Sequence, residues 1–194
     1  QFAFKGLLKN VRTPEQLGFD VTFNGSLARQ EILGYLPDSV VNKVLRLPDF
    51  TQVNGQAKGT VKDASGKIKL GLGGLGEILL DGTLLDSTYQ MDLVAQNLLV
   101  NRLAVDTTLR PLKTLGLKAH LSGEGFQLGK TASMKLTGKF DSLIWDNLIL
   151  RDITFDGDVK GKQFSGGLQS PDERVAVRIR AAGDFSTNIP VLDL

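Results

Sequence analysis

The sequence predicts a mainly β protein: one long, curved antiparallel sheet folded into a hydrophobic trough, as a folded (taco-like) sheet or a partly open barrel. Two observations predict it. Apolar and polar residues alternate over most of the chain, with the two-residue period of strands that have one apolar face. Glycine also recurs on the apolar line of these strands, where it permits a bend or a close approach.

The clearest alternation runs over residues 66–93. Ile68, Leu80 and Leu84 share one parity, whereas Lys67 and Asp81 share the other. Because successive strand side chains point to opposite faces, this stretch predicts a strand–turn–strand pair with one apolar and one polar face.

Similar alternation elsewhere predicts roughly a dozen strands at about 4.8 Å spacing. The period changes over residues 28–47, which predicts a helical insertion. Within it we expect a short amphipathic helix near 38–47, preceded by a helical turn around Arg29–Leu33. We expect residues 1–194 to form one continuous β-repeat domain excised from a longer chain.

A five-residue unit of apolar, polar, glycine, polar and apolar residues recurs along these strands. Glycine within a strand costs about 0.5–1 kcal/mol relative to alanine, so its recurrence indicates a shape requirement. The alternative is that glycine is simply common in β-rich proteins. The glycines predicted to bend the sheet into a groove are Gly25, Gly59, Gly82, Gly138, Gly157 and Gly183.

The apolar parity also predicts which side chains line the inside of the trough. These residues are Val53, Val61, Ile68, Leu70, Leu72, Ile78, Leu80, Leu84, Met91, Leu93, Leu117, Leu121, Met134, Leu136, Phe140, Ile153, Phe155, Val159, Val175, Val177 and Ile179.

The residues predict no catalytic, cofactor or metal site. His120 is the only histidine, it occupies a polar strand position, and cysteine is absent. The chain therefore has too few histidine and cysteine residues for the common zinc sites and for Ser-His-Asp or Cys-His arrangements. Residues 71–76 match the dinucleotide-binding pattern GxGxxG, but the residues that follow alternate like a strand and not like the required helix. We expect a hairpin turn there.

The remaining candidates have structural interpretations. Trp145 is expected in the core. A solvated strand face is expected for the carboxylates Asp156 and Asp158 and for the basic residues Arg174, Arg178 and Arg180. A net charge of +2 is too small to predict a nucleic-acid-binding face.

A family resemblance is carried by residues 112–126, 139–150 and 164–168, together with residues 35–38 and 61–70. They resemble the TamB/AsmA-like proteins (translocation and assembly module) of Gram-negative envelopes, especially Bacteroidetes-type versions. The resemblance implies an internal portion of a periplasmic protein anchored in the inner membrane, whose curved β-sheet has a hydrophobic trough that bridges the two membranes. It implies no catalytic residues.

The partners that the resemblance implies are phospholipid or other lipid acyl chains. Through the parent chain, they include a BamA-like outer-membrane protein or nascent outer-membrane proteins. We therefore expect a non-enzymatic periplasmic segment that holds or conducts acyl chains. Two alternatives stay open: a module that binds nascent outer-membrane protein strands by strand addition, and a closed β-sandwich that serves as an adhesin or scaffold.

Overall fold

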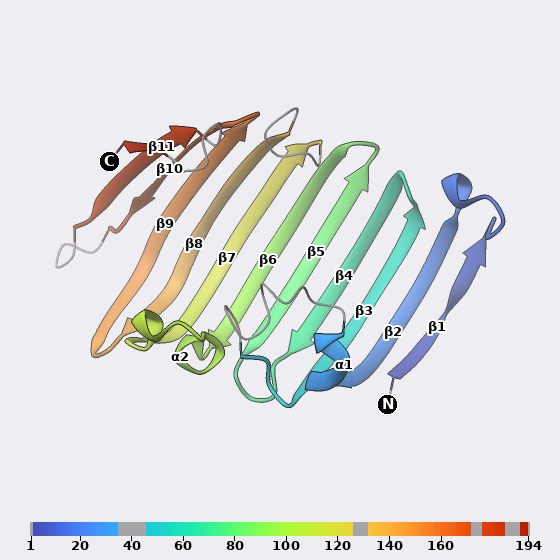
Figure 1. The fold of residues 1–194 in the computed structure, drawn as a ribbon, viewed down its shortest axis with the longest axis horizontal. Helices are drawn as coiled ribbons and strands as arrows, with labels where there is room; N and C mark the ends of the chain where they lie inside the picture. Colours follow the sequence, from blue (N-terminus) through green and yellow to red (C-terminus); the bar gives the residue numbers. More distant parts are fainter. Residues whose placement is uncertain (1, 35–45, 126–131, 172–175, 185–190, 194) are drawn as a thin grey trace.

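A single antiparallel sheet of twelve strands forms the chain in the computed structural model, which describes residues 2–34, 46–125, 132–171, 176–184 and 191–193. Each strand pairs with the strand before it, so the order in space is the order in the chain (Figure 1). The strands are β1 (Phe2–Lys9), β2 (Gly18–Ala28), β3 (Phe50–Thr60), β4 (Asp63–Gly71), β5 (Glu77–Leu85), β6 (Thr88–Leu98), β7 (Leu112–Glu124), β8 (Ser133–Trp145), β9 (Leu148–Lys160), β10 (Gln163–Gln169), β11 (Arg178–Asp184) and β12 (Val191–Asp193). The predicted mainly β, antiparallel architecture is confirmed.

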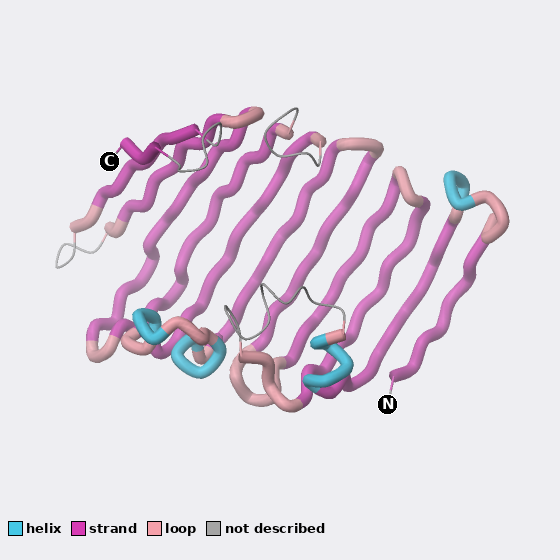
Figure 2. The backbone as a smooth tube through the Cα atoms, in the orientation of Figure 1, coloured by secondary structure: helices cyan, strands magenta, loops and turns pink. Residues whose placement is uncertain are grey.

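The described helices are short and lie at the ends of strands (Figure 2). They are α1 (Arg29–Leu33), α2 (Val100–Leu103) and the 3-10 turns η1 (Pro14–Gln16) and η2 (Thr107–Leu109). The helical turn predicted around Arg29–Leu33 is confirmed, and Glu31 Oε2 accepts a hydrogen bond of 2.7 Å from the Ala28 N–H at its start. Most of the helix predicted at 38–47 lies outside the described residues, and Arg46 and Leu47 are not helical.

The stretch with the clearest alternation forms three successive strands, β4, β5 and β6. The GxGxxG segment is the turn between β4 and β5, as predicted, and the Leu72 N–H donates a 2.9 Å hydrogen bond to the Gly76 carbonyl across it. Gly73 and Gly74 have φ angles of 56° and 80°, in the left-handed region where glycine avoids the steric cost of a side chain. These glycines therefore serve the turn.

The sheet is a single layer. Among the described residues the buried apolar side chains are Pro48, Ala95, Ala132 and Ile153. The chain exposes 13309 Å², whereas a compact protein of 21.0 kDa exposes about 9,000 Å². Trp145, predicted in the core, is 42% exposed because it ends β8 beside a turn. The side chains of one face therefore have no second layer to pack against.

The sheet is neither closed nor strongly curled. In the part of the chain that the structure describes, β1 pairs only with β2 and β12 only with β11, so the two ends of the sheet do not meet. The predicted antiparallel sheet is confirmed, but the described strands lack the strong curvature that the predicted taco-like trough or partly open barrel requires.

Candidate functional site: the apolar sheet face

Strand register aligns the apolar residues in four rows that cross the sheet, because directly paired residues share a face. We name each row by its β5 member, and together the four rows form the apolar face. The Ile78 row is Phe2, Gly25, Val53, Leu70, Ile78, Ala95, Leu117, Phe140 and Ile153. The Leu80 row is Phe4, Phe23, Gly55, Ile68, Leu80, Leu93, Ala119, Gly138, Phe155, Leu168 and Ile179.

The other two rows continue toward the β5–β6 turn. The Gly82 row is Gly6, Val21, Ala57, Gly66, Gly82, Met91, Leu121, Leu136, Gly157, Gly166 and Ala181. The Leu84 row is Leu8, Phe19, Gly59, Ala64, Leu84, Tyr89, Gly123, Met134, Val159, Phe164, Gly183 and Leu192. The four rows contain no charged residue, and the hydroxyl of Tyr89 is their only polar side-chain group.

The apolar face is large enough to accommodate a lipid acyl chain. Twelve strands extend over about 50 Å, and four rows cover roughly 20 Å along the strands. One leaflet of a bilayer contributes about 15 Å of hydrocarbon, half of the membrane core. An extended acyl chain therefore fits along the strands without leaving the apolar rows.

The opposite face is polar and carries pairs of opposite charges between neighbouring strands. Lys67 Nζ lies 2.7 Å from Asp81 Oδ2, and these two residues are direct partners on β4 and β5. His120 Nδ1 lies 2.7 Å from Asp92 Oδ1 in the same row. Sequence parity thus placed His120 correctly on the polar face.

The Lys67–Asp81 pair contributes little to stability at neutral pH. The hydrogen bond to Asp81, followed by its negative charge, raises the pKa of Lys67 above 10.5. A raised pKa means that the ammonium favours the fold below pH 10.5 and that this contribution is lost as the pH rises through the raised value.

We expect Lys67→Gln to leave the melting temperature at neutral pH nearly unchanged, because the side chains of Lys67 and Asp81 are 66% and 49% exposed and exposed pairs contribute little. Thermal denaturation at neutral and alkaline pH measures the effect. Deprotonation of Lys67 lowers the stability of the original chain at alkaline pH. The melting temperature of the variant should therefore fall less as the pH rises. A large fall in melting temperature at neutral pH would contradict this view of the polar face.

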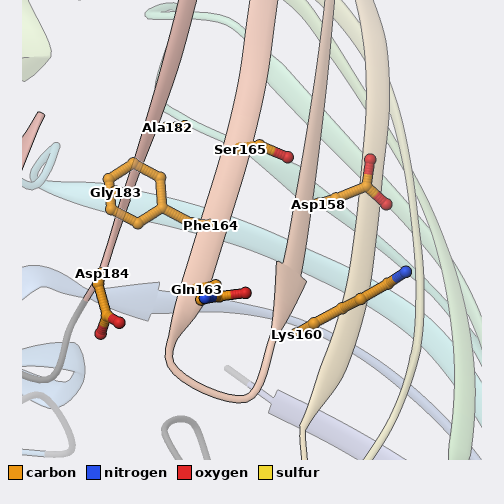
Figure 3. Close-up of a pocket in the computed structure, with 8 residues that line it drawn as sticks. All are labelled: Asp158, Lys160, Gln163, Phe164, Ser165, Ala182, Gly183 and Asp184. Atoms are coloured by element: carbon orange, nitrogen blue, oxygen red, sulfur yellow. The ribbon is translucent and has the colours of Figure 1, made fainter. Parts of the chain in front are cut away.

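Aromatic rings lie over glycines of neighbouring strands on the apolar face. A Cβ atom on Gly55 would overlap the ring of Phe23, and one on Gly138 would overlap the ring of Phe155. Both pairs are direct register partners. Figure 3 shows the same arrangement on β10 and β11, where the ring of Phe164 turns toward its own partner glycine. Glycine thus makes room for a flat ring.

The predicted bending glycines all lie on the apolar face, but they do not form a common bend. They are distributed over all four rows: Gly25, Gly138, Gly82 with Gly157, and Gly59 with Gly183. The Gly82 row nevertheless aligns five glycines, namely Gly6, Gly66, Gly82, Gly157 and Gly166, and the sheet is not strongly curled, so glycine alone does not fold it. Gly59 also has a specific backbone role, with φ of 134° beside the β3–β4 turn.

Most of the predicted lining residues occupy the four rows, with four exceptions. Val61 lies in the turn after β3 and is 47% exposed, and Leu72 lies in the turn after β4. Val177 precedes β11, and Val175 lies outside the described residues. The alternation of β3 and β4 continues into the turns that contain Val61 and Leu72, which is why parity alone included these two residues.

A shallow depression of about 560 Å³ interrupts the apolar face over β3–β6. Small residues of the Gly82 row, namely Ala57, Gly66 and Gly82, form its floor. Met91 and Leu121 border it on the next strands. The depression is open to solvent along the sheet.

A second hollow, of about 670 Å³, lies at the end of β9–β11 and is lined by both polar and apolar residues (Figure 3). Asp158 and Ser165 point away from the side on which the Phe164 ring lies. Its charged groups are Asp158, Lys160 and Asp184. Histidine and cysteine are absent from its lining.

Among the described residues, no three histidine or carboxylate side chains are placed to hold a metal ion. Nor does any helix within the described ranges have the length and hydrophobicity to cross a bilayer. Comparison with known proteins found no match to a family model, to a curated protein or to a solved structure.

Sequence reasoning missed part of the face. Phe4, Phe23 and Phe19 on the first two strands and Leu168 on β10 belong to the rows but were not predicted to line it. Their parity was the available signal. The pairing of rings with glycines needs the register between strands, which one sequence does not specify.

Proposed function

We propose that the apolar face holds lipid acyl chains, as a non-enzymatic segment of an envelope protein that carries lipid between two membranes. The observation that carries this proposal is the contiguous apolar surface of four rows, with one shallow depression, on an uncovered sheet. Soluble monomers rarely expose contiguous apolar patches of more than a few hundred Å², and larger ones mark interaction sites. Hydrocarbon is the partner that needs no polar complement.

The energetics favour a covered groove over a flat sheet. Moving a methylene from water into hydrocarbon gains about 0.8 kcal/mol, and a chain that lies on an open face gains roughly half of this. An open face therefore binds a lipid from water but loses about 0.4 kcal/mol per methylene against a bilayer. A conduit that loads and releases lipid must therefore also cover the side of the acyl chain that faces away from the sheet. For this reason the proposed function includes a trough of which the apolar face is one wall.

The cellular setting of the proposal comes from the resemblance to TamB/AsmA-like proteins. In that setting the segment lies in the periplasm, the parent protein is anchored in the inner membrane, and a BamA-like protein is a partner of the parent chain. The long meander order of the strands and the single apolar face support this likeness.

A second candidate function is capture of a nascent outer-membrane protein strand. All eight residues of β1 are exposed, and its outer edge has no partner strand in the described part of the sheet. An extended peptide adds to such an edge through backbone hydrogen bonds. Crosslinking to polypeptide at β1, in place of lipid on the apolar face, would favour this function.

We expect the full chain, purified from membrane-containing lysate without detergent, to retain phospholipid. Solvent extraction followed by mass spectrometry measures the bound lipid per chain. Lipid-free, monodisperse protein should also bind a hydrophobic dye that lysophospholipid displaces. Protein that carries no lipid and binds no dye would contradict the proposed function.

A further inference from the structure

We propose that a second copy of this chain covers the apolar face when lipid is absent. The two copies pack face to face, and lipid competes with this packing. The inference rests on the proposed function because the second copy and the acyl chains use the same surface.

The area available matches a stable dimer. The apolar face, about 50 Å by 20 Å, offers roughly 1,000 Å² per copy and 2,000 Å² in total, within the range of obligate homodimers. The chain exposes more surface than a compact protein of its size, and this excess area is larger than the area that one such interface would bury on each copy. Face-to-face packing of two sheets is also the arrangement that β-sandwiches use.

The Gly82 row is self-complementary in volume. Three small residues, Ala57, Gly66 and Gly82, follow one another on β3, β4 and β5. Three large residues, Met91, Leu121 and Leu136, follow on β6, β7 and β8. The row therefore has a depression directly beside a ridge.

A two-fold axis parallel to the strands, between β5 and β6, brings these features together. It places Met91 of each copy over Gly82 of the other, and Leu121 over Gly66. A two-fold interface makes each contact twice, so the ridge of each copy enters the depression of the other copy. The axis lies near the middle of the sheet, so most strands overlap (Figure 1). The absence of charge in the rows leaves nothing to repel a second copy.

The first test is the mass of the lipid-free full chain by sedimentation equilibrium. We expect twice 21.0 kDa, falling to the mass of one chain plus lipid when lysophospholipid is added. A monomer at every concentration overturns the inference but leaves the proposed function intact if lipid still binds. A dimer that binds no lipid supports the face-to-face packing of two copies but overturns the competition with lipid and refutes the proposed function.

The second test fills the depression. A Cβ on Gly82 meets only the Gln90 carbonyl oxygen at 3.4 Å and the Met91 side chain at 3.9 and 4.0 Å, so the strand accepts a side chain. Gly82→Leu should weaken dimerisation about tenfold or more, because the added side chain overpacks the depression that Met91 of the second copy enters. Gly157→Leu, the same change on the same face far from the axis, should have a smaller effect.

Transferring the large side chain from position 91 to position 82, without adding side-chain volume to the face, should restore the dimer. The double variant Gly82→Met with Met91→Gly exchanges ridge and depression at one contact, and we expect it to dimerise better than Gly82→Leu. Circular dichroism verifies that each variant is folded. Equal dimerisation of all variants would overturn the face-to-face arrangement and favour pairing through a sheet edge.

Disulfide trapping tests the arrangement without disturbing packing, since the chain contains no cysteine. The axis places Ile68 of one copy over Ala119 of the other. Within one chain these residues lie three strands apart, about 14 Å, which is too far for an internal disulfide. Ile68→Cys with Ala119→Cys should crosslink two copies, whereas the polar-face control Lys69→Cys with Lys118→Cys should not. Crosslinking of the control, or of neither pair, overturns the proposal.

Discussion

Replacing Leu80 by aspartate should weaken binding of a fluorescent acyl-chain probe by roughly fiftyfold. Leu80 lies in the middle of the apolar face, between Ile68 and Leu93 of the neighbouring strands. A carboxylate placed against hydrocarbon, together with the lost leucine contact, costs about 2–3 kcal/mol, which corresponds to this change in Kd. A fluorescence titration with delipidated protein measures it.

The matched control is the same substitution one residue earlier. Leu79 lies on the polar face, opposite Lys69 and Val94, and is 36% exposed. Leu79→Asp therefore adds the same charge to the same strand but should leave probe binding within about twofold, since that face contacts no hydrocarbon. Equal losses for Leu79→Asp and Leu80→Asp would mean that the probe does not use the apolar face.

Gly138→Ala should destabilise the chain by about 2 kcal/mol, or roughly 6 °C in melting temperature. A Cβ on Gly138 would overlap the Phe155 ring and lie 2.7 Å from the Lys118 carbonyl oxygen, so the ring and a neighbouring strand must both shift. Thermal denaturation followed by circular dichroism measures the change.

Gly157→Ala is the control for this effect, because its Cβ would meet nothing closer than the Ser165 carbonyl oxygen at 3.8 Å. Alanine there should leave stability unchanged or raise it by up to about 1 kcal/mol, the cost of glycine in a strand. If both alanine variants melt at the same temperature, the packing of rings over glycines does not stabilise the sheet.

The alternation predicted the two faces well because every long strand has one apolar and one polar side. Ile68, Leu80 and Met134 could be assigned to one face from parity alone, and the register then brought them onto the same side of the sheet. Parity does not mark where a strand ends. Val61 and Leu72 continue the pattern into turns and so lie outside the four rows.

The shape of the sheet could not be predicted in the same way. Glycines on the apolar line do not by themselves fold the sheet, because the register aligns Gly66, Gly82 and Gly157 in one row and the sheet is still not strongly curled. Gly82 and Gly138 occupy different rows, and Gly138 is covered by a ring from the next strand. The predicted trough therefore needs a cover, from further folding, from a second copy or from lipid, that the local pattern does not encode.

Site-specific photocrosslinking in cells tests most directly whether the apolar face contacts acyl chains. A photoreactive residue at Leu80 or Leu136 should form adducts with lipid, detected by mass spectrometry of the purified chain. The same residue at the neighbouring positions Asp81 and Lys135, on the polar face, should form none. Equal lipid labelling at all four positions, or labelling by polypeptide alone, would contradict the account.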